Sequence, residues 1–550
     1  MIFILILSFS ALLTTVMVPA AMKAGHLLGA VDVAGSRRVH SGAIPRTGGL
    51  AIAVGAMVPL VLIAKMEPHI PGICLGAACI LAVGLLDDLF DLDFRLKFLG
   101  QIGAAVVFLG VSGLRLAIPG ELWSGAWLHH ALASFFLSLF FMVATINAVN
   151  LADGLDGLAA GICLLIFTSV SFPAYTQNNS GALTVSVCMI GASIGFLRFN
   201  TYPAVVFMGD TGSQLLGYMV GAAMMLFTRP PIGNSSVLVL YFIGIPVLDT
   251  AMVILHRLIE HQPLFKPDMN HIHHKLLKLG FRHSHAVVVI YATQLGMILL
   301  GWTMRRSSAL HLLAAYVVII SVFLALLLFC PFGRITGKDD LTTAPAGEPY
   351  AQSTRRQLRL LISRAAWVGM TTALLVFYFY SPLLGRPIDK NMGVYSLGLA
   401  GIIFLIKIIN KNVPGGVMRI AAYFLAVYYI VLFDVANKSI ILWYYCHRYS
   451  LIVYILLGLS YIAYLVTTYD DVPIVAMDYL LLAVVVMTFF LPVSLLTIYH
   501  VNTITIKILI TFLGFELLRF KLGDRSNYLA VGLISALCLN FVMAFWPWII

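Results

Sequence analysis

Runs of about 20 apolar residues recur along this chain, and they constrain its fold more than any other feature. A run of that length crosses the hydrocarbon core of a bilayer as one helix. Of the 550 residues, 61% are hydrophobic and 10% are charged, whereas soluble domains carry about 25% charged residues. A soluble fold of this size could not bury that much apolar surface. The sequence therefore predicts an all-α, polytopic integral membrane protein built as a helical bundle.

We predict about eleven spans in the first part of the chain and about seven in the second. The first set is 2–22, 48–65, 72–86, 98–117, 131–147, 158–174, 181–197, 213–228, 235–255, 286–304 and 310–330. The second set is 365–382, 395–409, 418–434, 449–468, 475–498, 502–519 and 528–547. A stretch rich in Pro, Gly, Thr and charges separates the two sets and predicts a cytoplasmic linker. The predicted organisation is a membrane domain at 1–330, a linker at 331–364 and an additional membrane domain at 365–550.

The basic residues are distributed unevenly between the loops. One set of alternate loops holds eighteen Lys and Arg residues, and the opposite set holds five. Lys and Arg accumulate on the cytoplasmic side of membrane proteins, so the first set is predicted to be cytoplasmic and the N-terminus to lie outside. The same rule explains the net charge of +11 without a nucleic-acid partner. The first set comprises 23–47, 87–97, 148–157, 198–212, 256–285 and 331–364.

Ionisable residues are costly in hydrocarbon, so those at the ends of spans are candidates for a functional site. They gather in four clusters, all on the predicted cytoplasmic side. The first cluster is Asp87-Asp88, followed by Lys97 and Gln101. Adjacent carboxylates repel each other, and a nearby cation or basic partner makes such a pair tolerable. A solvated helix end is the plain alternative for this cluster.

The second cluster is a run of amides and carboxylates at the end of a span. They recur every third residue, which predicts a slowly rotating polar stripe at the membrane boundary. Two glycines within the run allow backbone N–H groups to approach a ligand closely. A helix cap uses one such residue and not four, so a ligand site is favoured over a plain cap. The four residues are Asn147, Asn150, Asp153 and Asp156.

The third cluster surrounds Asp210, which stands between Gly209 and Gly212 where the next span begins. A carboxylate at the start of a helix is a natural cap, because the helix dipole favours negative charge there. A carboxylate is also the ligand expected for a hard cation that bridges phosphate oxygens. Both interpretations remain open for this residue.

The fourth cluster is a histidine group in the basic loop 256–285, made of His271, His273 and His274. Binding phosphate or orienting a substrate suits so basic a loop. A zinc site would lack a cysteine or a matching third protein ligand, and a loop with exposed histidines is the plain alternative. The seven cysteines form no CxxC pair and predict neither a disulfide framework nor a metal site.

Acids, amides, a lysine and histidines on one membrane face suit phosphoryl transfer from a nucleotide diphosphate. A divalent metal bridges diphosphate oxygens and neutralises developing charge, while cations hold the leaving group. A lipid phosphate is largely ionised near neutral pH, so it can attack without a strong general base. The sequence contains no Walker-type loop for ATP-driven transport, and a secondary transporter would carry its polar residues near the midplane. A transferase is therefore favoured.

Over residues 20–330 these clusters resemble the polyprenyl-phosphate N-acetylhexosamine-1-phosphate transferases of the glycosyltransferase 4 family. The resemblance implies transfer of a sugar-1-phosphate from a UDP-sugar to undecaprenyl phosphate, release of UMP, and Mg²⁺ as cofactor, with Mn²⁺ as an alternative. The histidine group has the form of the WecA-like branch, which favours N-acetylglucosamine over the muramyl-pentapeptide substrate of the MraY branch. The motifs that carry the resemblance are Asp87-Asp88 with Lys97, residues 147–158, residues 196–213, His271–His274, Arg37-Arg38-Val39-His40, Pro45 and Gly48-Gly49.

Carried over residue by residue, the resemblance assigns expected roles. Asp210 would be the leading Mg²⁺ ligand, with Asp88 and Asn150 as further ligands. Asp87 and Asp88 would serve the acceptor phosphate and the metal–diphosphate complex, and Lys97 would hold phosphate. The other expected contacts are Asn147, Asn150, Asp153 and Asp156 in the nucleotide pocket, Phe207 against uracil, and His271, His273 and His274 on phosphates.

The chain departs from the family pattern in two places. Met269 stands where WecA-like sequences commonly have an arginine, and residues beyond about 360 lie outside the family core. A scaffold, a homodimer interface or a partner-docking surface is the expected role of the second membrane domain, and lipid handling is the alternative. The expected activity is the first membrane step of cell-envelope polysaccharide synthesis, at the cytoplasmic face of the bacterial inner membrane. Muramyl-pentapeptide transfer and a non-enzymatic transporter or scaffold are the alternatives.

Overall fold

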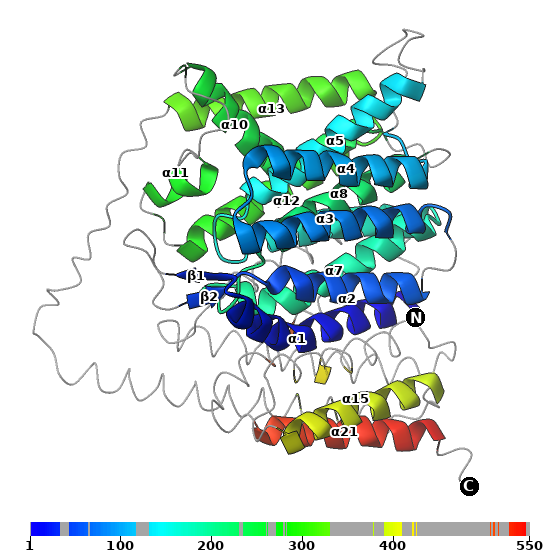
Figure 1. The fold of residues 1–550 in the computed structure, drawn as a ribbon. Coiled ribbons are helices and arrows are strands. Elements are labelled where there is room, and N and C mark those ends of the chain that lie inside the picture. The colour runs from blue at the N-terminus through cyan, green and yellow to red at the C-terminus, as the bar shows by residue number, and fades with distance from the viewer. Residues whose placement is uncertain are drawn as a thin grey trace, which may run out of the picture. The chain divides into compact units, whose positions relative to one another are not determined.

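The described helices of the computed structural model form two compact units, and the positions of the units relative to each other are not determined (Figure 1). Seven described helices are long and apolar enough to cross a membrane, so the predicted all-α, polytopic fold is confirmed. The predicted linker at 331–364 lies outside the described residues. The structure describes residues 2–33, 43–63, 67–116, 131–229, 235–259, 261, 271–278, 281, 283–329, 390–409 and 527–545, and ten single positions between 374 and 515.

Helices make up most of both units, with one short hairpin in the first. The second unit contains α15 (Lys390–Ile409), which packs along α21 (Asn527–Phe545). The first unit contains α1 (Ile2–Leu28), β1 (Val31–Val33), β2 (Ala43–Pro45), α2 (Gly48–Ile63), α3 (Ile70–Phe90), α4 (Phe94–Ser112), α5 (Ala131–Leu151), α6 (Leu158–Thr176), α7 (Ser180–Asn200), α8 (Gly209–Thr228), α9 (Val237–Phe242), α10 (Gly244–Ile259), α11 (Ile272–Lys278), α12 (His283–Met304) and α13 (Ala309–Phe329).

Ten of the eleven spans predicted for the first part coincide with one helix each. The prediction was wrong at 235–255, where two helices, α9 and α10, are separated at Ile243. Pro246 lies in the first turn of α10, where the missing N–H of proline is tolerated, whereas inside one long helix it would remove a hydrogen bond. In the second part, 395–409 and 528–547 coincide with α15 and α21. The other five predicted spans lie almost wholly outside the described residues.

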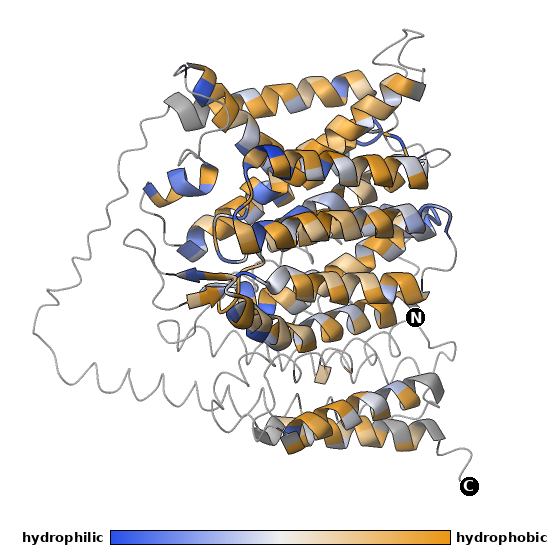
Figure 2. Cartoon of the chain, viewed as in Figure 1, coloured by the Kyte–Doolittle hydropathy of each residue, from blue (hydrophilic) through white to orange (hydrophobic). Residues whose placement is uncertain are grey.

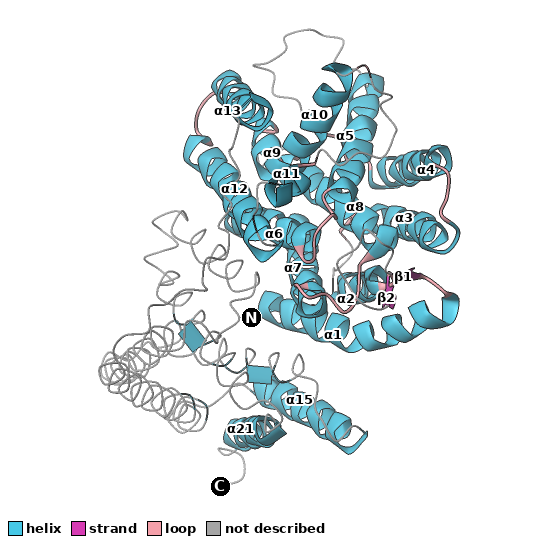
Figure 3. Ribbon diagram, turned by 90° about the vertical axis from the view of Figure 1, so that its left-hand side faces the viewer, coloured by secondary structure: helices cyan, strands magenta, loops and turns pink. Residues whose placement is uncertain are grey.

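Helix α8 is surrounded by other helices of the first unit (Figure 3). It packs against α2, α3, α5, α6 and α7, and its side chains are buried from Thr211 to Thr228. Glycines on two neighbours permit close approach: a Cβ on Gly49 would lie 2.2 Å from the nitrogen of Gly212, and one on Gly84 would lie 2.5 Å from the Cα of Thr211. Small residues allow tight van der Waals packing between helices in a membrane. These crossings fix the first turn of α8 relative to α2 and α3.

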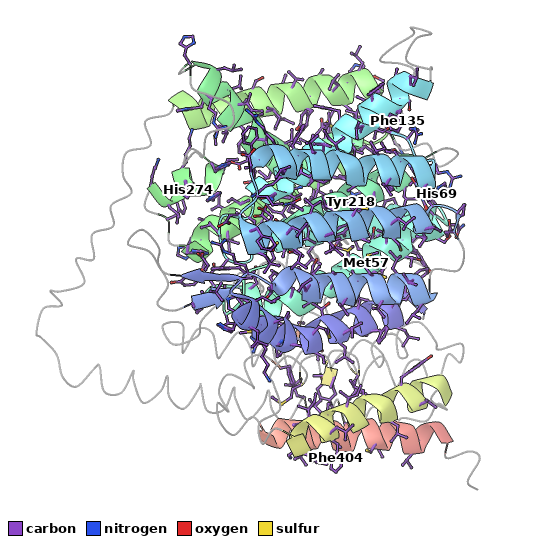
Figure 4. All side chains as sticks on the ribbon, viewed as in Figure 1. Met57, His69, Phe135, Tyr218, His274 and Phe404 are labelled. Atoms are coloured by element: carbon purple, nitrogen blue, oxygen red, sulfur yellow. The ribbon has the colours of Figure 1, made fainter. Side chains whose placement is uncertain are left out.

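Hydropathy differs between the middle and the ends of the helices (Figure 2). The helices of the first unit are mostly hydrophobic along their middle, and hydrophilic residues gather at the end near β1, β2 and α11. His274 and His69 lie at opposite ends of this unit (Figure 4). Large apolar side chains such as Phe98, Val106 and Phe140 are exposed on the surface. An apolar surface of this kind suits contact with lipid, as expected for a multi-pass membrane protein.

The hairpin of β1 and β2 leads into a backbone contact with the segment before α8. The N–H of Gly48 donates to the carbonyl of Phe207, and that of Gly49 to the carbonyl of Met208, both at 2.9 Å. In return, the N–H of Phe207 donates to the carbonyl of Pro45 at 2.8 Å. The first N–H groups of α2, which have no partner within their own helix, are thereby satisfied. The start of α2 and the segment before α8 therefore hold each other in place.

Candidate functional site

Five of the predicted site residues meet where α3, α4, α5 and α8 converge. Asp87 and Asp88 lie in the last turn of α3, and Lys97 lies in the first turn of α4. Asn150 lies in the last turn of α5, and Asp210 lies in the first turn of α8. The sequence predicts the two adjacent acids just beyond a span, whereas in the structure α3 continues through both of them. Because helix ends hold the site, its groups are fixed by helix packing rather than by loops.

Asp88 is hydrogen-bonded to the beginning of α8. Its Oδ1 accepts the backbone N–H of Asp210 at 2.8 Å. Its Oδ2 accepts the N–H of Thr211 at 2.9 Å and the Thr211 hydroxyl at 2.6 Å. The first N–H groups of a helix lack intrahelical partners and carry partial positive charge, so a carboxylate there is stabilising. Asp88 thus caps α8 from a different helix and fixes the position of Asp210.

Asp87 has different partners, although it is adjacent in sequence. Its side chain is 1% exposed, its Oδ1 accepts the N–H of Leu92 at 3.0 Å, and its Oδ2 lies 2.6 Å from Lys97 Nζ. The same ammonium lies 3.7 Å from Asp210 Oδ2. Burying a carboxylate is tolerated when a cation and hydrogen bonds compensate it, and both are present here. Lys97 therefore neutralises a buried acid and still lies beside Asp210.

Asp210 is partly accessible, with 32% of its side chain exposed. Its Oδ1 accepts the amide N–H of Asn150 at 2.6 Å, while Lys97 is beyond hydrogen-bond distance of its Oδ2 at 3.7 Å. The preceding Gly209 has a φ of +68°, and a Cβ there would lie 2.1 Å from the carbonyl oxygen of Arg46. Only glycine fits this position without strain. Asp210 is therefore held by its neighbours, with oxygen lone pairs left for a ligand.

The groups around Asp210 fit a Mg²⁺ ion that also binds substrate phosphates. Mg²⁺ in proteins is usually held by one or two carboxylates together with phosphate and water oxygens. Asp210 offers a carboxylate, and Asn150, whose NH₂ faces it, offers an amide oxygen. Both oxygens of Asp88 already accept hydrogen bonds, which favours Asp210 over Asp88 as the ligand. Within the described residues, no group of three or more His, Cys, Asp or Glu side chains could hold a metal ion.

The predicted polar stripe in the second cluster is not a continuous helical stripe. Asn147 and Asn150 lie on α5, whereas Asp153 and Asp156 lie in the turn between α5 and α6. Gly157, which precedes α6, has a φ of +80°, a conformation that no continuing α-helix contains. Asp and Gly residues favour turns, and this preference overrides the helical spacing here. The spacing therefore predicted a stripe along one helix, whereas the structure divides the four residues between the end of α5 and the following turn.

The turn between α5 and α6 is anchored by residues from α7, α12 and the segment after α7. Asp156 Oδ2 accepts the N–H of Ala204 at 2.9 Å, and the N–H of Asp156 donates to His283 Nε2 at 3.0 Å. Asn200 Oδ1 accepts the N–H of Gly157 at 3.0 Å. These bonds make Asp156 a residue that holds the turn. Its expected contact with the nucleotide remains a prediction.

Asp153 lies in the same turn and is partly buried. Desolvation, with repulsion from Asp210, Asp156 and Asp88, raises the pKa of Asp153 to about 7. The negative charge gathered around it favours a ligand that brings positive charge, such as a metal-bound diphosphate. A bare anion would be repelled by the same groups. The expected role of Asp153 in the nucleotide pocket remains a prediction.

Asn147 belongs to a network of amide side chains, and Phe207 lies in the segment before α8. The amide of Asn147 donates to Gln101 Oε1 at 2.6 Å, and Gln101 Nε2 donates to Gln214 Oε1 at 3.4 Å, which links α5, α4 and α8. Gln101 and Gln214 are buried. Phe207 is partly buried in the segment before α8. Contact of Asn147 with substrate and of Phe207 with uracil both remain predictions.

The three predicted histidines lie at the start of α11 and just before it. The ring of His273 is placed against Gly154 in the turn between α5 and α6, because a Cβ on that glycine would lie 2.1 Å from His273 Nε2. The ring centroids of His271 and His273 are 5.5 Å apart with nearly parallel planes, and those of His273 and His274 are 4.3 Å apart. The histidine group therefore contacts the site through this turn.

Burial, with repulsion from His274, lowers the pKa of His273 to about 4. Because this pKa is below the ordinary value of about 6.5, the contribution of neutral His273 to stability is complete above pH 6.5 and is lost as the pH falls towards 4. We expect the midpoint of thermal unfolding in detergent to fall over this range, and to fall less in His273→Gln. The exposed His285→Gln variant should behave as the wild type. Equal pH dependence in all three proteins would contradict the buried, neutral state of His273.

The sequence did not identify several residues that hold the site. Asp249 on α10 is buried beside His271, and its presence inside an apolar run was a signal that could have been used. Asn200 and His283 anchor the turn between α5 and α6 from distant parts of the chain. Spacing within one sequence carries no signal for such long-range partners. The motif residues Arg37, Arg38, His40 and Met269 lie outside the described residues.

Comparison with known proteins agrees with this arrangement. Residues 70–228, which contain α3 to α8, match the model of glycosyl transferase family 4. The chain is 33% identical over 296 residues, 52% of its length and 81% of the relative's, to a probable undecaprenyl-phosphate N-acetylglucosaminyl 1-phosphate transferase of Bacillus subtilis (strain 168). It is 36% identical over 48% of its length to a decaprenyl-phosphate N-acetylglucosaminephosphotransferase of Mycolicibacterium smegmatis, covering 72% of that protein.

A third relative matches a longer part of the chain. The undecaprenyl-phosphate alpha-N-acetylglucosaminyl 1-phosphate transferase of Escherichia coli O157:H7 is 29% identical over 327 residues, 58% of this chain and 87% of the relative. All three matches cover most of the relative but only about half of this chain. The chain therefore belongs to the polyprenyl-phosphate N-acetylhexosamine-1-phosphate transferase superfamily, glycosyl transferase family 4, on its WecA-like branch.

Proposed function

We propose that this protein transfers N-acetylglucosamine-1-phosphate from UDP-N-acetylglucosamine to a polyprenyl phosphate, with release of UMP. The observation that carries this proposal is the convergence of Asp210, Lys97 and Asn150 at the ends of α8, α4 and α5. A partly exposed carboxylate, an ammonium and an amide in contact are suited to a metal-bound diphosphate. The names of the relatives, which align over most of their length, support the sugar and the lipid acceptor.

The reaction needs positioning and neutralisation of charge more than acid–base chemistry. An oxygen of the polyprenyl phosphate attacks the β-phosphorus of the UDP-sugar. A new P–O bond forms while the bond from that phosphorus to the bridging oxygen breaks, and its electron pair leaves with UMP. The attacking phosphate is already largely ionised near neutral pH. The protein therefore has to bring two anions together and stabilise the charge on the leaving group.

Each side chain of the site has a defined part in this task. Lys97 provides the cation for phosphate oxygens, and Asp87 fixes its position through the 2.6 Å ion pair. Asp88 holds the first turn of α8, so that the carboxylate of Asp210 is presented at one place. Mg²⁺, held by Asp210 with Asn150, would supply the Lewis acid that neutralises the diphosphate. This division of roles gives the two adjacent acids separate positioning functions.

The location of the site supports a cytoplasmic orientation and an enzyme rather than a transporter. Its residues lie in or beside 87–97, 148–157 and 198–212, which belong to the set of loops rich in Lys and Arg. This charge distribution supports a site on the cytoplasmic face of the bacterial inner membrane, where a soluble nucleotide and a lipid phosphate could both reach it. A transporter would hold its ligand near the midplane. Here the polar groups gather at one end of the helices (Figure 2).

Release of UMP by the purified protein tests this proposal directly. With UDP-N-acetylglucosamine, undecaprenyl phosphate and Mg²⁺, we expect UMP to be formed only when the lipid is present. Chelation with EDTA should stop the reaction, and added Mg²⁺ should restore it, because the metal neutralises the diphosphate. UDP-N-acetylmuramyl-pentapeptide should be a poor donor. A folded protein without lipid-dependent UMP release would contradict the proposal, and full activity in EDTA would contradict its metal.

A further inference from the structure

Asp249 is a buried carboxylate on α10 that the proposed mechanism has not used. Its side chain is 5% exposed, and most of the helix around it is apolar. A carboxylate in such surroundings is costly unless it is paired and hydrogen-bonded. Asp249 meets this condition because both of its oxygens have partners on another element. An ionisable group maintained at this cost is a strong indication of a functional role.

Both partners of Asp249 lie where α11 begins. Its Oδ2 lies 2.7 Å from His271 Nδ1, and its Oδ1 accepts the backbone N–H of Ile272 at 2.6 Å. One carboxylate therefore holds the main chain at the start of α11 and, at the same time, the ring of the residue before it. Because the attachment has two points, the ring cannot rotate without losing a buried hydrogen bond. The position of His271 is fixed by α10.

The pairing also determines which ring nitrogen of His271 is available to a ligand. A carboxylate oxygen only accepts hydrogen bonds, so Nδ1 carries the proton in this contact. Nε2 is then the remaining ring nitrogen, with either a lone pair or, in the imidazolium, a second N–H. A carboxylate that holds a histidine in this way fixes its tautomer and stabilises its positive charge.

The neighbouring histidines of this group have other contacts. Asp249 is the negative group beside His271. His273 stacks on it at 5.5 Å and is neutral near pH 7, because burial lowers the pKa of His273 to about 4. His274 lies 6.5 Å away, and His283 on α12 uses its Nε2 to accept a backbone N–H. The pairing with Asp249 therefore distinguishes His271 from these histidines.

We propose that Asp249 is a positioning residue for sugar-phosphate transfer, which holds His271 so that its Nε2 binds a phosphate oxygen of the UDP-sugar. This inference rests on the proposed function and deepens it, because it assigns different tasks to the histidines. His271 binds the nucleoside diphosphate, whereas His273 packs on the turn between α5 and α6. Asp249 acts through the ring and does not touch the substrate.

Asp249→Asn tests the pairing with little change in shape. The asparagine oxygen can still accept the N–H of Ile272, but its NH₂ then faces Nδ1 of His271, which must take the opposite tautomer. We expect kcat/KM for UMP release to fall about 10–100-fold, the usual effect of removing such a partner of a functional histidine. In that tautomer Nε2 still carries a proton, but without a carboxylate beside the ring its hydrogen bond to phosphate is no longer charge-assisted. Asp249→Glu should recover part of the loss.

A double-mutant cycle shows whether Asp249 acts through His271. Since both changes interrupt one interaction, the double variant of Asp249→Asn and His271→Gln should lose no more activity than His271→Gln alone. Thr250→Ala, next to Asp249 on the same helix and bonded within it, is the matched control and should keep wild-type activity. Losses that multiply in the double variant, or an activity in Asp249→Glu no higher than in Asp249→Asn, would overturn the positioning role.

A readout that needs no activity separates this inference from the proposed function. In protein labelled with ¹⁵N-histidine, we expect a low-field Nδ1–H resonance that disappears in both Asp249→Asn and His271→Gln. Its absence from the wild type would overturn the pairing itself. A folded wild type that shows the resonance but releases no UMP would overturn the proposed function, and with it the phosphate ligand assigned to His271.

Discussion

Asp210→Asn is expected to lower the rate of lipid-dependent UMP release by about 10²–10³-fold, the range for loss of one electrostatic contact in a transition state. The substitution removes one negative charge and preserves the shape of the side chain. Asparagine can still accept the 2.6 Å hydrogen bond from Asn150, and Asp88 still holds the backbone of α8. The fold should therefore survive. The loss of activity would then be due to the missing carboxylate, which is the proposed metal ligand at the diphosphate.

The measurement is a UMP assay on detergent-purified variants, together with thermal unfolding of each. Loss of an acidic group from the first turn of a helix costs about 0.3–1 kcal/mol, so the unfolding midpoint should change little. The matched control is Asp91→Asn, which removes an exposed carboxylate at the end of α3. Asparagine suits its φ of 48°, and this variant should retain activity. Equal losses in both variants would show that net charge matters and that Asp210 has no special role.

The fold could be predicted from hydropathy because a membrane restricts the possible structures so strongly. Each apolar run of sufficient length has to form a helix, since backbone groups cannot remain unpaired in lipid. The failure at 235–255 has a local cause: hydropathy records the apolar residues on both sides of Ile243 but not the break that the structure shows there. The hairpin of β1 and β2 was not predicted, because its strands contain three residues each and carry no periodic signal.

The composition of the site could be predicted, but its connections could not. Their cost in hydrocarbon singled out Asp87, Asp88, Lys97 and Asp210 at the ends of spans, and the family resemblance gave them their expected roles. Adjacent residues in sequence, however, gave no indication that Asp87 pairs with α4 while Asp88 caps α8. That distinction arises because successive residues on a helix point about 100° apart and meet different neighbours. It belongs to tertiary packing and is visible only in the structure.

Lys97→Gln is expected to reduce both activity and stability, for two separate reasons. Activity should fall roughly a hundredfold, because a cation next to Asp210 no longer reaches the phosphates. Stability should fall by about 1–3 kcal/mol, because Asp87 is left buried without its charged partner. UMP release and thermal unfolding measure the two effects independently. Arg95→Gln, an exposed cation two residues earlier on α4, is the matched control and should change neither quantity appreciably.

The double variant of Asp87→Asn and Lys97→Gln separates these two effects. With both charges removed, no buried carboxylate is left without a partner, and asparagine can still accept the N–H of Leu92. A buried ion pair can often be replaced by neutral groups with little loss of stability, whereas removal of one partner is costly. The unfolding midpoint should therefore return towards that of the wild type while the activity stays as low as in Lys97→Gln. If activity returned together with stability, Lys97 would be a residue that stabilises α3 against α4, and the cation for the diphosphate would have to come from another part of the chain.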